Sequence, residues 1–81
     1  MTISVGDTVD YYVNGRLRIY RGVITRAADA TTNCYQLLVT RVYDQSYYYP
    51  SEALTVGERR SAFFTCVVMV SPLELLAECA E

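Results

Sequence analysis

Apolar and polar residues alternate along two segments near the start of the chain, 9–13 and 17–26. Alternation over this length is typical of half-buried β-strands, and the Asn-Gly pair between the segments indicates a hairpin turn. A two-residue loop would mix the apolar and polar faces. A three-residue loop pairs Val13 with Leu17 and keeps the faces in agreement. We therefore expect a hairpin with the longer loop or a bulge.

The expected register assigns the other facing residues of this hairpin. The pairs are Tyr11 with Ile19, Tyr12 with Arg18, and Asp10 with Tyr20. The last two pairs lie on the outer face of the hairpin. Gly22 interrupts the second strand, and a glycine inside an apolar, β-branched strand often marks a sharp bend at the corner of a barrel.

Three further segments predict the rest of the sheet. Segment 34–43 is rich in Leu and Val, a short segment 47–49 ends at Pro50, and segment 62–70 is apolar on both parities. An antiparallel sheet usually has one face in contact with water. A strand that is apolar on both faces must therefore be covered twice.

The end of the chain has the features of a helix start. Ser71 can cap the helix, Pro72 suits the first helical position, and Glu74 completes a capping box. The expected apolar stripe of this helix consists of Leu73, Leu76, Ala77 and Ala80. We expect the stripe to pack on the second face of the 62–70 strand, because helical spacing places these residues together.

These elements predict a mainly β fold, a five-stranded SH3-like antiparallel barrel with a short C-terminal α-helix. The 81 residues form one domain, with the barrel over about residues 3–70 and the helix over about 72–80. Hydrophobic residues make up 52% of the chain, slightly above the usual range. A small domain can bury such a surplus against another copy of itself, so we expect a homo-oligomer, either a dimer or a tetramer.

The composition excludes several kinds of chemistry. The chain has no His, which removes the commonest general base and zinc ligand and excludes Ser-His-Asp and Cys-His catalysis. Its net charge is −2, whereas a non-specific DNA binder normally carries net positive charge. No spacing of carboxylates indicates a metal site or an acid/base pair. The residue types favour a non-enzymatic protein without a metal or a cofactor.

The cysteines and the N-terminus predict a cytoplasmic location. The chain has three cysteines, Cys34, Cys66 and Cys79. Their odd number and the absence of a CxxC pair favour reduced thiols. The first residues have neither a basic region nor a long apolar region, so we expect no signal peptide. The longest apolar run, 66–70, is too short to span a membrane.

A tyrosine-rich surface is the candidate ligand site, for a protein or a small molecule. Tyrosine supplies a large rigid contact area with a hydroxyl, and arginine stacks and pairs with carboxylates or phosphates. The candidate residues are Tyr12, Arg18, Tyr20, Tyr47, Tyr48 and Tyr49. The alternative is that the tyrosines are ordinary strand residues and that Tyr12 and Arg18 form an ordinary cross-strand pair.

One parity of the 62–70 strand is the candidate oligomer interface. Its residues are Phe63, Val67 and Met69. Exposed apolar strips usually mark interaction sites. The alternative is that the C-terminal helix covers this strip, and the two arrangements are compatible.

Single-stranded nucleic-acid binding needs a basic groove with stacking aromatic side chains. The arginines around the second strand are Arg16, Arg18, Arg21 and Arg26. Arg21 lies on the opposite parity from the other three, and Asp10 is nearby. This dilution of the patch disfavours nucleic acid as the partner.

Four short motifs follow one another along the chain: Gly6-Asp7-Thr8-Val9, Gly22-Val23-Ile24, Tyr35 at the start of a strand, and Tyr49-Pro50-Ser51-Glu52-Ala53-Leu54. In this order they resemble the SH3-like barrel of the plasmid-borne, trimethoprim-resistant type II dihydrofolate reductases, over residues 6–54. The resemblance implies a barrel, a homo-oligomer and a gene on a mobile element. Residues 56–81 have no counterpart in that family.

In that family a Val-Gln-Ile-Tyr segment before the proline and a nearby Lys contact nicotinamide and pterin in the pore of a tetramer. Only the tyrosine carries over, as Tyr49, because Tyr47 and Tyr48 replace Gln and Ile and the chain has no Lys. The sequence therefore favours a non-enzymatic, self-associating SH3-like binding module. The alternatives are a reductase-like oxidoreductase with a remodelled pore and a single-stranded nucleic-acid binder.

Overall fold

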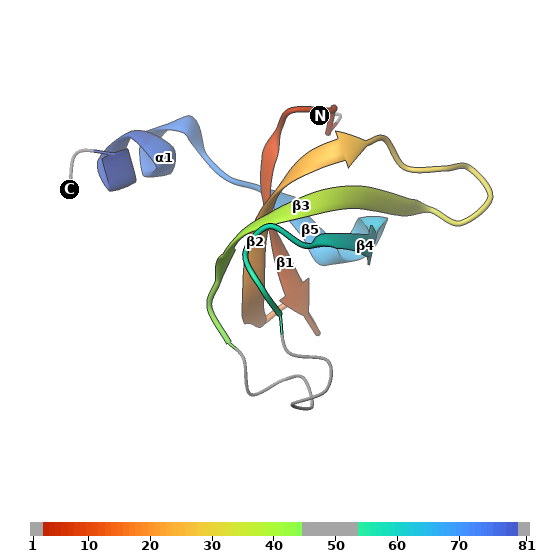
Figure 1. Ribbon diagram of the computed structural model, residues 1–81, viewed down its shortest axis with the longest axis horizontal. Coiled ribbons are helices and arrows are strands. Elements are labelled where there is room, and N and C mark those ends of the chain that lie inside the picture. The colour runs from red at the N-terminus through yellow and green to blue at the C-terminus, as the bar shows by residue number, and fades with distance from the viewer. Residues whose placement is uncertain (1–2, 45–53, 80–81) are drawn as a thin grey trace.

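The computed structural model describes residues 3–44 and 54–79, which form five antiparallel strands in one open sheet and a short helix. The elements are β1 (Thr8–Val13), β2 (Leu17–Arg26), β3 (Cys34–Val42), β4 (Arg59–Phe63), β5 (Val67–Met69) and α1 (Pro72–Cys79). The strand order is β4-β3-β2-β1-β5, so the last two strands lie at opposite edges of the sheet (Figure 1). The prediction of a mainly β fold with a C-terminal helix is confirmed.

The prediction of one continuous strand over 62–70 is wrong. A 3-10 turn at Phe64–Cys66 divides the segment, and β4 pairs with β3 whereas β5 pairs with β1. The turn also changes the parity that faces the core, because Ala62 and Val67 are both buried. This change explains why the segment is apolar on both parities. The predicted strand 47–49 lies outside the described residues.

The β1–β2 hairpin has the predicted three-residue loop. Near the loop the pairs are those expected, Val13 with Leu17 and Tyr12 with Arg18. Further along, the predicted register is wrong: Tyr11 pairs with Tyr20, and Asp10 pairs with Arg21. A bulge causes the shift, because it inserts Ile19 between paired residues and lets both Ile19 and Tyr20 face the core.

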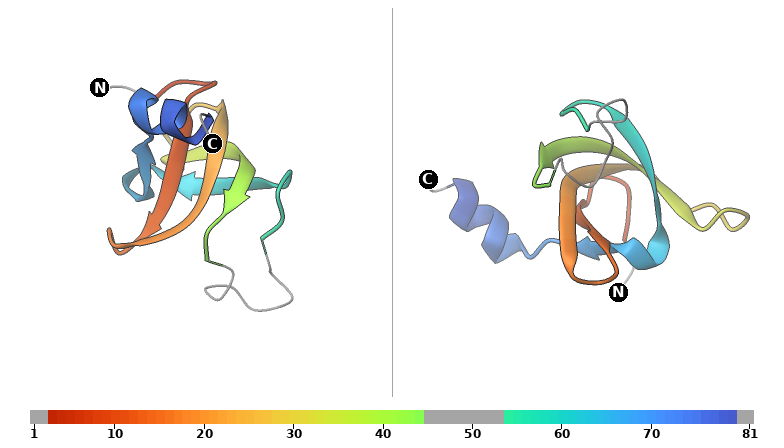
Figure 2. Two further views of the ribbon diagram at one scale, coloured as in Figure 1. Left: turned by 90° about the vertical axis from the view of Figure 1, so that its left-hand side faces the viewer. Right: turned by 90° about the horizontal axis from the view of Figure 1, so that it is seen from below.

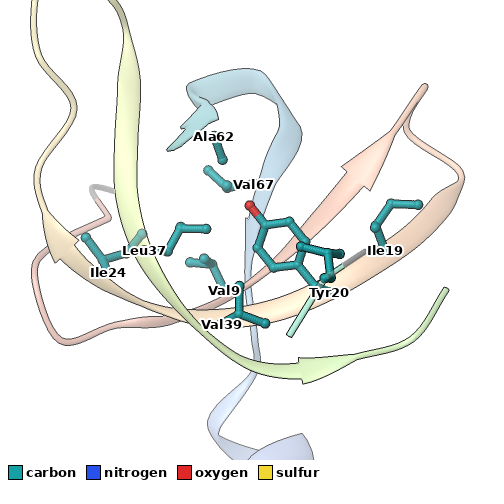
Figure 3. Close-up of a cluster of buried hydrophobic side chains, with 9 residues drawn as sticks. Val9, Ile19, Tyr20, Ile24, Leu37, Val39, Ala62 and Val67 are labelled. Carbon is teal, nitrogen blue, oxygen red and sulfur yellow. The ribbon is translucent and has the colours of Figure 1, made fainter. Parts of the chain in front are cut away.

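The hydrophobic core draws side chains from all five strands. Its buried members are Val9, Ile19, Tyr20, Ile24, Leu37, Val39, Leu54, Ala62 and Val67 (Figure 3). The ring of Tyr20 stacks on that of Tyr11, with a centroid separation of 4.9 Å and an interplanar angle of 16°. Stacking at this distance adds to the stability that burial of the two rings supplies.

A side chain at Gly22 of β2 would meet the backbone of β3. A Cβ atom at this position would be 2.8 Å from the backbone carbonyl oxygen of Leu38. The β2–β3 register also shifts between Arg21 and Gly22. The residue is therefore a glycine because the two backbones leave no room for a side chain.

The predicted start of α1 at Pro72 and the cap by Ser71 are confirmed, but the Glu74 carboxylate contacts arginines of the sheet where a capping box was predicted, and the predicted packing of the apolar stripe is wrong. The backbone N–H of Leu73 donates a hydrogen bond to Ser71 Oγ at 3.2 Å. Leu73 and Leu76 are 78% and 67% exposed, and α1 projects from the side of the sheet (Figure 2). The expected fourth stripe residue, Ala80, lies outside the described residues. No helix within residues 3–44 and 54–79 is long and apolar enough to cross a membrane.

Candidate functional site: two arginine-containing surfaces

The structure brings together only part of the predicted tyrosine-rich surface, because Tyr12 pairs with Arg18 whereas Tyr20 does not join them. Tyr20 is buried in the core, and Tyr12 is half-buried on β1. Arg18 has a partly exposed side chain and belongs to a group of charges described below. The other three candidates, Tyr47, Tyr48 and Tyr49, lie outside the described residues. They include the positions that correspond to the active-site segment of the type II reductases. Tyr20 is therefore a core residue here, because the bulge at Ile19 turns it inward.

The same bulge creates the first surface, by placing Arg21 opposite Asp10. Val68 pairs with Asp10, Asp10 with Arg21, and Arg21 with Arg41, so these side chains form a row across four strands. Tyr43 and two glutamates of α1 complete the group. We call it the arginine–carboxylate cluster, and its members are Asp10, Arg18, Arg21, Arg41, Tyr43, Glu74 and Glu78.

Arg21 is the centre of the cluster. It and Asp10 are only 4% and 3% exposed. Arg21 donates from Nε to Asp10 Oδ1 at 2.9 Å and from Nη2 to Asp10 Oδ2 at 3.3 Å. It also donates to Glu74 Oε1 at 3.3 Å and to Glu78. The hydrogen bond to Asp10 raises the pKa of Arg21 above its ordinary value, against the effect of burial.

The other two arginines extend the cluster to its edges. Arg18 Nη1 lies 3.5 Å from Asp10 Oδ2 and 3.6 Å from Glu74 Oε1. Arg41 Nη1 lies 3.5 Å from Glu78 Oε1. Three guanidinium groups thus face three carboxylates, and the cluster is neutral as a whole.

The ring of Tyr43 lies among the three arginines. The guanidinium carbon of Arg18 is 3.9 Å from the ring centroid, and those of Arg41 and Arg21 are 5.0 and 5.7 Å away. These distances allow cation–π attraction. The Tyr43 hydroxyl is buried and has no hydrogen-bond partner among the described residues. Burial raises the pKa of Tyr43, and Asp10 raises it further, while the arginines oppose the shift.

The cluster holds α1 against the sheet through charge rather than through apolar packing. Glu74 and Glu78 contact the arginines, while Leu73 and Leu76 point to solvent. Because the chain's own carboxylates already occupy every arginine of the cluster, its evident role is structural. It is a poor candidate for the ligand site.

The second surface is a polar cavity at the far end of β2 and β3. It has a volume of about 380 Å³ and is lined by Thr25, Arg26, Gln36 and Arg59, which we call the basic pocket. Strand pairing assembles it, since Arg26 faces Gln36 across β2–β3 and Arg59 faces Leu38 across β3–β4. The sequence alone does not reveal this arrangement, because Arg26 and Arg59 are 33 residues apart in the chain.

Both arginines of the basic pocket are exposed. No carboxylate in residues 3–44 or 54–79 forms a salt bridge with either of them. The polar wall between them is ordered: Thr25 Oγ1 donates to the Gln36 carbonyl oxygen at 3.2 Å, and Gln36 Nε2 donates to Ser61 Oγ at 3.0 Å. Unpaired guanidinium groups beside fixed polar groups can bind an anion.

The residues of the predicted oligomer interface also lie in different environments. Val67 is buried in the core opposite Tyr11, and Met69 is half-buried. Phe63 is 44% exposed at the end of β4, and its ring lies 5.0 Å from that of Phe64, which is 48% exposed. An unbroken strand would place Phe64 on the opposite face from Phe63, but the 3-10 turn brings the two rings together.

Metal chemistry finds no support in the described part of the chain, where no group of three Cys, Asp or Glu side chains could hold an ion. No protein-family model, curated protein or solved structure matches the chain. The two surfaces are therefore the basis for assigning a function.

Proposed function

We propose that this chain is a non-enzymatic binding module that takes an anionic ligand in the basic pocket. The observation that carries the proposal is the pairing of two exposed arginines, Arg26 and Arg59, across a cavity of about 380 Å³. Hydrogen bonds to charged groups contribute about 1.5–3 kcal/mol each, more than those between neutral groups. The ligand carries phosphate or carboxylate groups that the two guanidinium groups can bind.

We further propose that the sheet works as an SH3-like barrel. Consecutive strands β4 and β5 lie at opposite edges of the sheet, and only the 3-10 turn at Phe64–Cys66 separates them in the chain. Such a connection brings the two edges towards each other, and Gly22 allows the close approach of β2 to β3 that a strongly curved sheet needs. A curved scaffold of this kind fixes the two arginines of the pocket relative to one another.

Replacing Arg26 or Arg59 with Ala should weaken the binding of tripolyphosphate by at least about tenfold, because each variant removes a charged donor. Isothermal titration calorimetry at low salt measures the change. Arg16→Ala is the matched control, since Arg16 is an exposed arginine of the β1–β2 loop and not part of the pocket. Equal losses in all three variants, or no binding by the native chain, would contradict the proposal.

Self-association is a second candidate property, favoured by the exposed stripe of α1. An isolated helix of this length is marginal in water. The two described carboxylates of α1, Glu74 and Glu78, face the sheet, so the stripe of Leu73, Leu76 and Ala77 carries no charge that would repel a second copy. We propose that two copies pair through this stripe.

The double variant Leu73→Ser/Leu76→Ser should raise the dissociation constant of the dimer by about tenfold or more, because leucine burial is lost on both copies. Sedimentation equilibrium over a range of concentrations measures it. Leu17→Ser is the control, since Leu17 is also exposed but lies on the β1–β2 hairpin. A native chain that stays monomeric at millimolar concentration would remove this candidate.

A further inference from the structure

The outer face of β4 continues from the basic pocket to the two exposed phenylalanines. Residues of β4 alternate between core and solvent, so Arg59, Ser61 and Phe63 all project from the outer face, while Ala62 is buried. At about 3.3 Å per residue, Arg59 and Phe63 lie about 13 Å apart along the strand. Phe64 extends the aromatic end beyond the strand.

Neighbouring strands make this face continuous. Gln36 of β3 pairs with Ser61 and bonds to its hydroxyl, and Arg26 of β2 pairs with Gln36. We call the whole surface the β4 strip, and it consists of Arg26, Gln36, Arg59, Ser61, Phe63 and Phe64. It has cations at one end, an amide and a hydroxyl in the middle, and two aromatic rings at the other end.

Glu58, which precedes Arg59 in the chain, has partners outside the strip. Glu58 Oε2 lies 3.4 Å from Arg60 Nε, and Glu58 Oε1 accepts a hydrogen bond from the backbone N–H of Thr55 at 2.6 Å. Three further carboxylates belong to the arginine–carboxylate cluster, where they face arginines. None of these four carboxylates therefore forms a salt bridge with an arginine of the strip.

We infer that the β4 strip binds single-stranded nucleic acid, with phosphates at the arginines and bases stacked on the phenylalanines. This inference rests on the proposed anion binding at the pocket and names the class of ligand. Unpaired cations beside exposed aromatic rings are what sequence-tolerant single-strand binding requires, and stacking a base on a ring contributes about 1–3 kcal/mol. An acidic peptide would use the arginines but would gain less from the rings. In a duplex the base faces are stacked inside the helix and cannot stack on Phe63 or Phe64.

The inference differs from the sequence-based alternative in where the site lies. The sequence grouped four arginines around the second strand, but Arg18 and Arg21 are paired with carboxylates in the cluster. Only Arg26 of that group belongs to the strip. Arg59 and the two phenylalanines replace the others, because strand pairing and the 3-10 turn bring them to one face.

Fluorescence anisotropy with a labelled oligo(dT) of about 12 nucleotides, at about 50 mM salt, tests the inference. Phe63→Ser and Phe64→Ser should each weaken binding by about fivefold to a hundredfold, the range that loss of a stacked base predicts. Arg59→Ala should weaken binding and lower its salt dependence. Arg16→Ala and Leu17→Ser are the matched controls and should change affinity less than twofold. Circular dichroism confirms that each variant is folded.

Three probes separate the possible failures: oligo(dT), an abasic oligonucleotide of the same length, and poly-glutamate. If oligo(dT) binds no more tightly than the abasic strand and the Phe variants change nothing, the nucleic-acid inference is overturned while anion binding stands. Equal binding of poly-glutamate and oligo(dT) would also overturn it, in favour of an acidic protein partner. If oligo(dT) binds and Arg26→Ala/Arg59→Ala has no effect, the anion pocket itself fails. If no probe binds, both proposals fail.

Discussion

Arg21→Met should reduce the free energy of unfolding by about 3–5 kcal/mol, the typical loss when one partner of a buried ion pair is removed. The variant leaves the Asp10 carboxylate almost fully buried without its two hydrogen bonds from Arg21. It also removes the contacts of Arg21 with Glu74 and Glu78, which are two of the four ion pairs that join α1 to the sheet among the described residues. A domain of this size is stabilised by only about 4–12 kcal/mol in total. The expected loss is therefore a large fraction of the total stability.

Urea denaturation followed by circular dichroism measures this loss, and two further variants serve as comparisons. Arg41→Met removes an exposed arginine of the same cluster and should cost less than about 1 kcal/mol. Asp10→Leu/Arg21→Met replaces the buried pair with apolar side chains, and it should be clearly more stable than Arg21→Met alone. If Arg21→Met cost no more than Arg41→Met, the central role of Arg21 would be contradicted.

Gly22→Val should be the second most damaging change, with a loss of about 3 kcal/mol or more, and Gly22→Ala should cost about 1–3 kcal/mol. The first added carbon would lie 2.8 Å from the Leu38 carbonyl oxygen and 3.3 Å from the Leu37 Cβ atom. The nearer obstacle is backbone, which a rotamer change cannot move. Valine favours strands, so a loss from this substitution must come from crowding rather than from β-propensity.

Thermal unfolding of both variants gives the comparison, with Gly15→Asn as the control. Gly15 has a φ of +69° and no atom within 4 Å of an added Cβ, and asparagine tolerates this region better than most residues. The control should therefore change stability by less than about 0.5 kcal/mol. A Gly22→Val variant as stable as the control would mean that β2 and β3 can separate at this point without cost.

The local pattern of residues was sufficient to locate most of the helices and strands. Alternation located β1 and β2, the Asn-Gly pair located their loop, and the Ser-Pro start located α1. These features depend on neighbours in the chain, so the residues that produce them are visible in the sequence. The pairing of Val13 with Leu17 was predictable for the same reason, because it lies next to the loop.

The candidate surfaces were not predictable in this way. The bulge at Ile19 shifted the register, so Tyr20 entered the core and Arg21 came to face Asp10. Two consecutive residues, both able to pack in a core, give no sign in the sequence of which one will break the alternation. The tyrosine-rich surface was predicted on the unbroken register, and the shift removed Tyr20 from it while Tyr12 and Arg18 stayed paired.

The orientation of α1 was also not predictable from the sequence. Its spacing predicted an apolar stripe opposite a glutamate face, and α1 has both. Periodicity does not say which face meets the sheet. That choice was made by Arg21, whose burial beside Asp10 provides a site for Glu74 and Glu78 and so leaves Leu73 and Leu76 exposed.

By itself the sequence determined that this chain forms a small, mainly β domain with a terminal helix, and it excluded histidine-dependent chemistry. Only the tertiary structure decided where charge and aromatic surface gather. It joined Arg26 to Arg59 across three strands, brought Phe63 beside Phe64, and paired Arg18 and Arg21 with the carboxylate of Asp10. The physical reason is that local periodicity sets which element forms, whereas register, bulges and turns set which distant side chains meet.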